Sequence, residues 1–586
     1  MNTRPFLITS TQDFQKPRNL KAKVIYLGAW CNPYKQKNKE TLQENTTASY
    51  HWNNRLKLKS DYKLIIKHYK YYLKKLTLVL NNIHKVNNQE RYWNILIGPW
   101  LLRLLTIYFD RYAQIKKTIK TNRNLTAISI KSDPFKFTPL DTQEFVDLCI
   151  DDPFNENICI EILKEFQVRI AYKEKSAKTE IKKIKQIKVR PLNKILQNIS
   201  KWTPYRLYKN NKFVTEATYL KKRHEILLNI ILGQIPQKLN FCKILNIKVD
   251  PIMRNQLKSE CQFKGKFGHS FGKIIYKYFP KIFLEGFALQ KDKLNSAYLP
   301  LMPKIIFTCN SHWYNDPFKI WAAEKMHYGA KLVIGQHGGF YGLAAWGSQE
   351  EHELKIADAY ISWGWNSRKH NIHSLGMLTR QDENVRPNSH GGIILIQNQI
   401  RRFPYLNRSS PICSEDWEPY FSDLVQFKNN LTQNIRNNLF IRPFFCKPQN
   451  EDLQWKEEWP QVKFDNSKSR ISKYVANYRI AVISYQGTPL NELMYMNFPH
   501  IVMWDPHFWE LRPDAKTVFQ TLKKAGLFFD NPEKAAEKIN SIWGSVNHWW
   551  FSSPVQRARR IFCALYAKKS PSICFDLKNL FLHELK

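Results

Sequence analysis

A histidine that directly follows an apolar run and precedes two glycines has the clearest chemical meaning in this chain. The stretch 331–341 reads KLVIGQHGGFY, so a predicted strand ends at Gln336 and His337 and continues into Gly338 and Gly339. Glycines let a backbone approach a ligand closely, and the carboxyl edge of a parallel sheet is where ligands bind. We therefore expect His337 to act on a ligand that Gln336 and the two glycines contact.

A second histidine has a similar setting. The run KIIFTCN (304–310) is followed by His312, and adjacent strands of a doubly wound sheet open into one crevice, so His312 and His337 could face the same ligand. A neutral histidine serves as a general base toward a hydroxyl group, and a protonated one pairs with a diphosphate. Either histidine could instead only hydrogen-bond loop backbone, and the sequence leaves this open.

A turn in the second half has the features of an anion site. In SYQGTPLNE an apolar run ends at Ser484, Gly487 turns the chain, Thr488 can cap a helix, and Glu492 falls one turn inside it. The amino terminus of a helix attracts phosphate, and a carboxylate one turn further on can accept hydrogen bonds from ribose hydroxyls. An ordinary capped helix explains the segment equally well.

Arg512 follows the next apolar run, in WDPHFWELRPD (504–514). Its guanidinium could clamp a phosphate, and an aromatic packing cluster with a polar rim is the alternative. The chain contains no Asp-x-Asp pair and no Gly-x-x-x-x-Gly-Lys-Ser/Thr motif. We therefore expect neither a metal site nor a cofactor.

These residues need a fold that brings strand ends together. After residue 303, short apolar runs alternate with helical stretches, a pattern typical of parallel sheets covered on both faces. The polar stretch 379–390 is the expected linker between two α/β domains. The expected parts are an N-terminal domain over 1–378 with a helical insertion at about 140–300, a second domain over 391–545, and a helical tail over 546–586 that packs back on the first domain.

The amino-acid composition indicates which classes of partner the chain could bind. With 91 Lys and Arg against 49 Asp and Glu, the net charge is +42, which attracts nucleic acid, anionic membranes or phosphorylated substrates. Ten scattered cysteines without a Cys-x-x-Cys pattern indicate a reducing compartment, and the amino terminus lacks a signal-peptide core. The segment 92–109 is interrupted by Pro99 and Arg103, which favours a buried helix starting again at Pro99 over a membrane span.

Several blocks between residues 26 and 567 resemble a bacterial family of transferases associated with O-antigen and other surface-carbohydrate clusters. They include YLGAWCNPY, YHWNNR, GQHGGFYG, SYQGTPLNELMYM and WWFSSPVQRARRIFCALYA. More distantly, the chain is similar to capsule Kdo-type transferases and teichoic-acid glycerophosphate polymerases. The resemblance implies a GT-B-like fold, with two Rossmann-like doubly wound domains and a C-terminal helix crossing back.

The resemblance also implies roles for particular residues. His337 matches the catalytic or phosphate-contacting histidine, and Ser484, Thr488 and Glu492 match the donor-binding turn. Independently of the resemblance, the leading hypothesis gives His312 and Asp316 a role on the acceptor side. The chain departs from its relatives at Asn53 and Asn54, where they carry acidic residues, and at Arg442, where the distant groups have histidine.

The leading expectation is a metal-independent glycosyltransferase at the cytoplasmic face of the membrane. It would move a sugar from a nucleotide-sugar onto a surface polysaccharide or a lipid-linked saccharide, with peripheral contact to anionic lipid and no nucleic-acid partner. One alternative is a basic nucleic-acid-binding protein, for which affinity falls steeply with salt. The other is a catalytically silent partner in a polysaccharide assembly complex.

Overall fold

The computed structural model describes eight stretches of the chain. They are residues 4–10, 23–31, 46–130, 133–173, 205–236, 239–379, 384–444 and 451–586. The expected linker 379–390 falls partly outside them.

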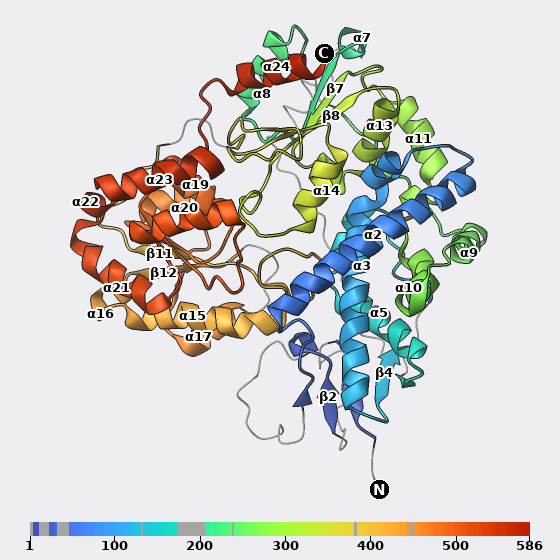
Figure 1. The fold of residues 1–586 in the computed structure, drawn as a ribbon, viewed down its shortest axis with the longest axis horizontal. Coiled ribbons are helices and arrows are strands. Elements are labelled where there is room, and N and C mark those ends of the chain that lie inside the picture. Colours follow the sequence, from blue (N-terminus) through green and yellow to red (C-terminus); the bar gives the residue numbers. More distant parts are fainter. Residues whose placement is uncertain are drawn as a thin grey trace.

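Three parallel sheets form the framework (Figure 1). The first has the order β3 (Thr46–Thr47), β2 (Val24–Tyr26), β1 (Phe6–Ile8), β4 (Thr126–Ile130) and β5 (Arg169–Lys173). The second has the order β10 (Ile372–His373), β9 (Ala359–Ile361), β8 (Lys331–Gly335), β7 (Ile305–Thr308) and β6 (Phe213–Glu216). The third has the order β13 (Lys463–Phe464), β12 (Leu439–Arg442), β11 (Ile393–Ile396), β14 (Ile480–Ile483), β15 (His500–Met503) and β16 (Phe528–Phe529).

The strand order shows where ligands can enter. In the third sheet the chain builds outward from β11 through β12 to β13, then returns to add β14 on the other side of β11. The direction reverses between β11 and β14, and the loops that follow these two strands diverge there. The first sheet reverses in the same way between β1 and β4, whereas the second sheet adds its strands in sequence.

The predicted α/β class with parallel sheets is confirmed, and the apolar runs after residue 303 form strands of the second and third sheets. The N-terminal half nevertheless holds two sheets where the sequence led us to expect one. Strands β5 and β6 lie within 140–300, the segment expected to be helical. Both are short, with five and four residues, so they carry little periodic signal.

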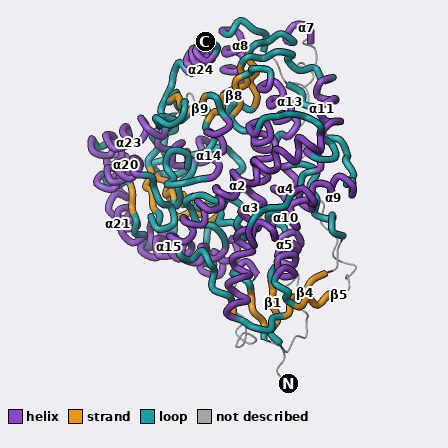
Figure 2. Tube along the Cα trace, turned by 45° about the vertical axis from the view of Figure 1, so that its right-hand side comes forward, coloured by secondary structure: helices purple, strands orange, loops and turns teal. Residues whose placement is uncertain are grey.

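Two long helices cross the N-terminal half, α2 (Arg55–His84) and α3 (Glu90–Thr121) (Figure 2). Helix α3 contains the segment 92–109 and runs through Pro99 without a break, so the expected fresh start at Pro99 is wrong. Its side chains are buried from Tyr92 to Arg111 because α3 contacts helices of both N-terminal sheets. None of the described helices is both long and apolar enough to span a membrane.

The C-terminal tail crosses back to the second sheet, as expected (Figure 1). Helix α23 (Ser553–Tyr566) packs on the helices of the third sheet, and α24 (Ile573–Glu584) packs on α8 (Lys222–Ile231). The ring of Phe581 stacks on Phe213 at 6.0 Å. The tail therefore packs on both the third and the second sheet, with α23 and α24 contributing to two separate apolar cores.

Candidate active site

The end of β8 is fixed by Gln336. Its side-chain oxygen accepts hydrogen bonds from the Trp363 backbone at 2.9 Å and the Trp365 indole at 2.8 Å, and its amide donates to the Gly338 carbonyl at 2.8 Å. Gln336 is buried. All three bonds shape the loop, so they give Gln336 a structural role in place of the expected ligand contact.

His337 follows at the edge of the buried interior, with 14% of its side chain exposed. Its Nε2 lies 3.3 Å from the Tyr341 hydroxyl. Its Nδ1 has no hydrogen-bond partner among the described residues and lies 3.6 Å from Glu353 Oε1. Burial lowers the pKa of His337, and the Glu353 carboxylate opposes that shift. The imidazole is therefore neutral at pH 7, as a general base must be.

Glu353 is the centre of the polar groups around His337. It lies on α14 (Ser348–Ile356), is fully buried, and accepts hydrogen bonds from Trp313 Nε1 at 2.6 Å, Tyr341 at 2.7 Å and Tyr360 at 3.2 Å. Burial raises its pKa, and His337 opposes this shift. Sequence reasoning missed its role, because SQEEHELK contains three glutamates and only tertiary packing selects one.

His312 lies next to His337, with ring centroids 6.2 Å apart. Its Nε2 is 3.3 Å from Glu353 Oε1, and burial lowers its pKa to about 3. The proximity agrees with the expected shared crevice. However, His312 is fully buried, so it has no surface with which to touch an acceptor.

Asp316 begins α13 (Asp316–His327) and is also fully buried. Its Oδ1 pairs with Lys319 at 2.5 Å, and its Oδ2 accepts from the Thr142 backbone at 2.7 Å. Lys319 in turn donates to the Leu96 carbonyl of α3 at 2.9 Å. Asp316 therefore anchors α13 to its neighbours, a structural role in place of the expected catalytic one.

A cavity of about 390 Å³ opens beside the end of β7. Asn310 lies two residues beyond Thr308, the last residue of β7, which pairs with Ile334 of β8. Its side-chain oxygen is buried without a hydrogen-bond partner in the described parts of the chain. The walls combine amide, hydroxyl, amine and aromatic groups, from residues that include Phe241, Lys243, Asn310, Ser311 and Tyr314.

The turn after β14 meets the His337 loop directly. The Gly339 backbone donates to Thr488 Oγ1 at 3.1 Å, at the start of α19 (Thr488–Met496). A Cβ atom on Gly339 would lie 2.1 Å from Asn491 Oδ1 and 2.6 Å from the Thr488 nitrogen. The two predicted site segments therefore lie together, and they touch across the boundary between the second and third sheets.

The remaining predicted donor residues have other partners. Ser484 is buried, with its hydroxyl 2.9 Å from the Ile396 carbonyl and 2.6 Å from Tyr420 Oη. Arg512 donates to Glu350 Oε1 at 2.6 Å, which ties the third sheet to α14. Glu492 is half-buried one turn inside α19, where the spacing places it.

Three glycines were expected to admit a ligand. Gly338 is half-buried, and a Cβ atom added there would come no closer than 3.1 Å to its nearest described neighbour, the Tyr341 ring. Gly487 is buried, and a Cβ there would lie 2.3 Å from the Tyr485 ring. The space beside Gly339 is filled by α19. Of the three, Gly338 leaves the most space.

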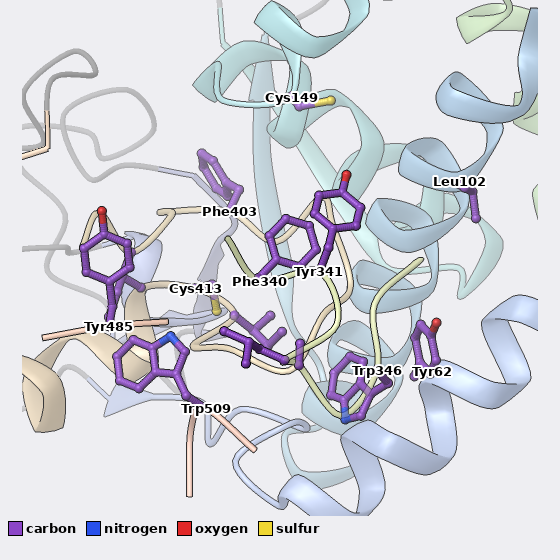
Figure 3. Close-up of a cluster of buried hydrophobic side chains, with 14 of the residues drawn as sticks. Tyr62, Leu102, Cys149, Phe340, Tyr341, Trp346, Phe403, Cys413, Tyr485 and Trp509 are labelled. Carbon is purple, nitrogen blue, oxygen red and sulfur yellow. The ribbon is translucent and has the colours of Figure 1, made fainter. Parts of the chain in front are cut away.

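Aromatic rings surround this boundary (Figure 3). Phe340 and Tyr341 stack at 4.2 Å in the His337 loop, with Phe403 and Tyr485 from the third-sheet side on one flank. No group of three or more His, Cys, Asp and Glu side chains in the described ranges has the arrangement of a metal site.

Similar solved structures include the S. aureus MnaA–UDP co-structure, with 9% identity, 64% of this chain and 96% of that chain covered, and a TM-score of 0.35. Anabaena HepE in complex with UDP and glucose has 9% identity, with 64% of this chain and 100% of that chain covered and a TM-score of 0.34. The wall teichoic acid polymerase TagF with CDPG has 9% identity, with 67% of this chain and 95% of that chain covered and a TM-score of 0.31. Such low TM-scores assign no ligand or reaction. No curated protein matches the chain. The model of the LIC12162 family transferases matches residues 5–581, and the chain belongs to this family.

Proposed function

We propose that this transferase is a glycosyltransferase of the GT-B type that uses a nucleotide-sugar donor. The observation that carries the proposal is the position of His337, a neutral and partly exposed imidazole backed by a buried carboxylate. It lies where the second sheet meets the third, close to the point at which the third sheet reverses direction, and such points bind nucleotides in α/β folds.

In the proposed reaction, the sugar moves from the donor phosphate to the acceptor hydroxyl. The bond between the anomeric carbon and the donor phosphate oxygen breaks, and its electron pair stays on the phosphate. The acceptor hydroxyl takes the place of the Tyr341 hydroxyl beside His337 Nε2, bonds to the anomeric carbon and gives its proton to that nitrogen. With the other proton on Nδ1, that N–H faces Glu353, which stabilises the imidazolium that forms. The scheme requires no metal ion.

Replacement of the base tests the proposal. In a His337→Ala protein, we expect transfer from nucleotide-sugars to fall by about a hundredfold or more, since general base catalysis contributes 10²–10⁴. His269→Ala, an exposed histidine on α10 (Gly265–Tyr278), is the matched control. Both variants should keep the wild-type melting temperature. A folded His337→Ala protein with full turnover contradicts the proposal.

The acceptor is proposed to be a surface polysaccharide or a lipid-linked saccharide. The cavity at Asn310 supports this, because amide and aromatic side chains together suit a sugar. The protein would work at the cytoplasmic face of the membrane, in peripheral contact with anionic lipid.

Helix α2 supports the membrane contact. Its solvent-exposed face carries seven lysines and no exposed acidic residue, and Leu56 and Leu78 are 80% and 60% exposed. The lysines are Lys57, Lys59, Lys63, Lys67, Lys70, Lys74 and Lys75. Each lysine near an anionic bilayer adds about 1 kcal/mol of binding.

Vesicle binding tests this surface. We expect the protein to bind phosphatidylcholine vesicles only when they contain phosphatidylglycerol, and a Lys63, Lys67 and Lys74 triple glutamine variant to bind about a hundredfold more weakly. The control triple variant changes the exposed lysines Lys516, Lys524 and Lys534 of the third-sheet half. Equal binding by both variants contradicts the membrane contact. Duplex DNA that displaces the protein from vesicles would instead favour a nucleic-acid partner.

A further inference from the structure

Two arginines in the loop after β11 have no carboxylate partner within the described parts of the chain. Arg408 donates from Nε to Ser410 Oγ at 3.3 Å, and its guanidinium carbon lies 4.8 Å from the centre of the Phe340 ring. Arg401 lies 4.4 Å from the centre of the Tyr405 ring. The neighbouring Arg402 differs, because it pairs with Asp152. Among the described residues, no ion pair to Arg401 or Arg408 is formed.

The loop that carries both arginines begins at the place where the strand order of the third sheet reverses, between β11 and β14. Strands β11 and β14 pair in register up to Ile396 and Ile483, so the loop with both arginines and the turn before α19 leave the same edge. Phe340, under Arg408, directly follows Gly339 of the His337 loop. The guanidinium of Arg408 therefore lies over Phe340 of the His337 loop.

The backbone around Arg408 is fixed. Arg408 forms an antiparallel bridge with Gly347. On either side, the Ser348 backbone donates to the Asn407 carbonyl and the Ser409 backbone donates to the Trp346 carbonyl, both at 3.0 Å. These bonds join the third-sheet loop to the segment that leads into α14. Arg408 is thus positioned by both halves of the boundary.

The electrostatics of the pair are unfavourable without an anion. Burial lowers the pKa of Arg408 to about 10, and the nearby Arg401 charge contributes to that shift, so the Arg408 side chain remains charged at pH 7. Both side chains are half-buried. A charge that is partly removed from water without a counter-charge is costly, and two like charges increase that cost. A phosphate group would supply the missing charge, and planar guanidinium donors suit phosphate oxygens.

The helix terminus that the sequence indicated is less available. At the start of α19 the Thr488 hydroxyl accepts from Gly339, and Gly339 packs against Gly487 and Thr488. The positive charge for a donor phosphate must therefore come largely from neighbouring side chains. Arg401 and Arg408 lie on the adjacent loop. Among the described residues, the side-chain hydrogen bond of this pair is the one from Arg408 Nε to Ser410, so their other guanidinium N–H groups are available to a phosphate.

We propose that Arg401 and Arg408 bind the diphosphate of the nucleotide-sugar donor and stabilise it as the leaving group. This inference rests on the proposed function and names the groups that replace a metal ion in it. When the anomeric carbon–oxygen bond breaks, the new negative charge on the phosphate oxygen faces the two guanidiniums. The acceptor proton goes to His337.

Calorimetry with defined anions tests the pair. The probes are inorganic pyrophosphate, UDP, CDP, GDP and CMP, and the variants are R401Q, R408Q, the double glutamine variant and the double lysine variant. We expect at least one nucleoside diphosphate to bind, the double glutamine variant to bind it about a hundredfold more weakly, and the double lysine variant to be intermediate. The control is R557Q, an exposed arginine on α23.

Several outcomes would overturn the inference. One is unchanged binding of the best nucleoside diphosphate by the folded double glutamine variant, with melting temperature as the check on folding. Another is a wild-type protein that binds none of the diphosphates. A third is pyrophosphate binding as tightly as every nucleoside diphosphate, which would assign the arginines to a diphosphate on the acceptor. Full turnover in His337→Ala with loss of binding in the arginine variants would refute the proposed base and leave the anion site standing.

Discussion

Two of the histidine–carboxylate pairs among the described residues differ in how completely their polar groups are hydrogen-bonded. In the first-sheet region, His51 Nε2 lies 3.0 Å from Asp110 Oδ1, and Asp110 also accepts from Tyr50 and pairs with Arg111. At the second sheet, Glu353 lies 3.6 Å from His337, whose Nδ1 has no hydrogen bond to any described residue.

The two histidines also differ in how much of each side chain is exposed to solvent. His51 is 4% exposed, and its Nδ1 lies 3.4 Å from Lys57 Nζ, so both ring nitrogens face protein groups. The His337 side chain is 14% exposed at a boundary between two sheets. A closed, satisfied network stabilises a fold, whereas an incomplete and accessible one can take up a proton from a ligand.

The largest expected effect comes from removing the carboxylate of the fully hydrogen-bonded pair, His51 and Asp110. In Asp110→Asn, the buried Arg111 guanidinium loses its counter-charge, so the free energy of unfolding should fall by about 3–5 kcal/mol. Urea denaturation measures this. In the matched variant Glu353→Gln, no described arginine or lysine is left unpaired, so the loss should be smaller. Equal losses would remove the distinction between the two pairs.

A second prediction concerns acid. The pKa of His312 is about 3 in the folded protein and ordinarily 6.5, so the unfolded state binds the proton first as the pH falls. The resulting stability is present above pH 6.5 and is lost between pH 6.5 and 3, by about 1.4 kcal/mol per pH unit. His312→Gln should remove this component from the pH dependence of unfolding. Parallel curves for wild type and variant would contradict it.

The smallest expected effect is a shift in a pH profile. The base must be neutral, so kcat/KM should fall as the pH drops through the pKa of His337, which lies below 6.5. Glu353 raises that pKa, and Glu353→Gln should therefore move the acid limb to lower pH, by about one unit or less. Glu351→Gln, on the same helix but bonded to Tyr62, should leave the limb in place. If the acid limb of the Glu353→Gln profile stays at the wild-type pH, Glu353 does not control the pKa of His337.

The sequence predicted the elements with strong local signals. Apolar runs of four or more residues marked strands such as β8 and β14, and the turn residues placed Gly339 and Thr488 at neighbouring edges. Strand β1, with three residues, lies below what periodicity can detect.

Other site features depend on tertiary packing. Ser484 and Asp316 have side chains that suit chemistry and structural hydrogen bonds equally, and only the fold reveals the Ile396 carbonyl and Lys319 as their partners. The role of Glu353 arises from Trp313, Tyr341 and Tyr360, which come from three separate segments. Likewise, spacing cannot reveal which arginines find a carboxylate partner in the folded chain.

The contact at Gly339 has a consequence for turnover. A hydrogen atom is the largest substituent that fits between this residue and α19, since a methyl group would overlap Asn491 and Thr488. Gly339→Ala would therefore act as a wedge one carbon wide, forcing the loop and the helix apart. If substrate entry requires these surfaces to part and chemistry requires them to rejoin, position 339 determines how tightly the enzyme can shut.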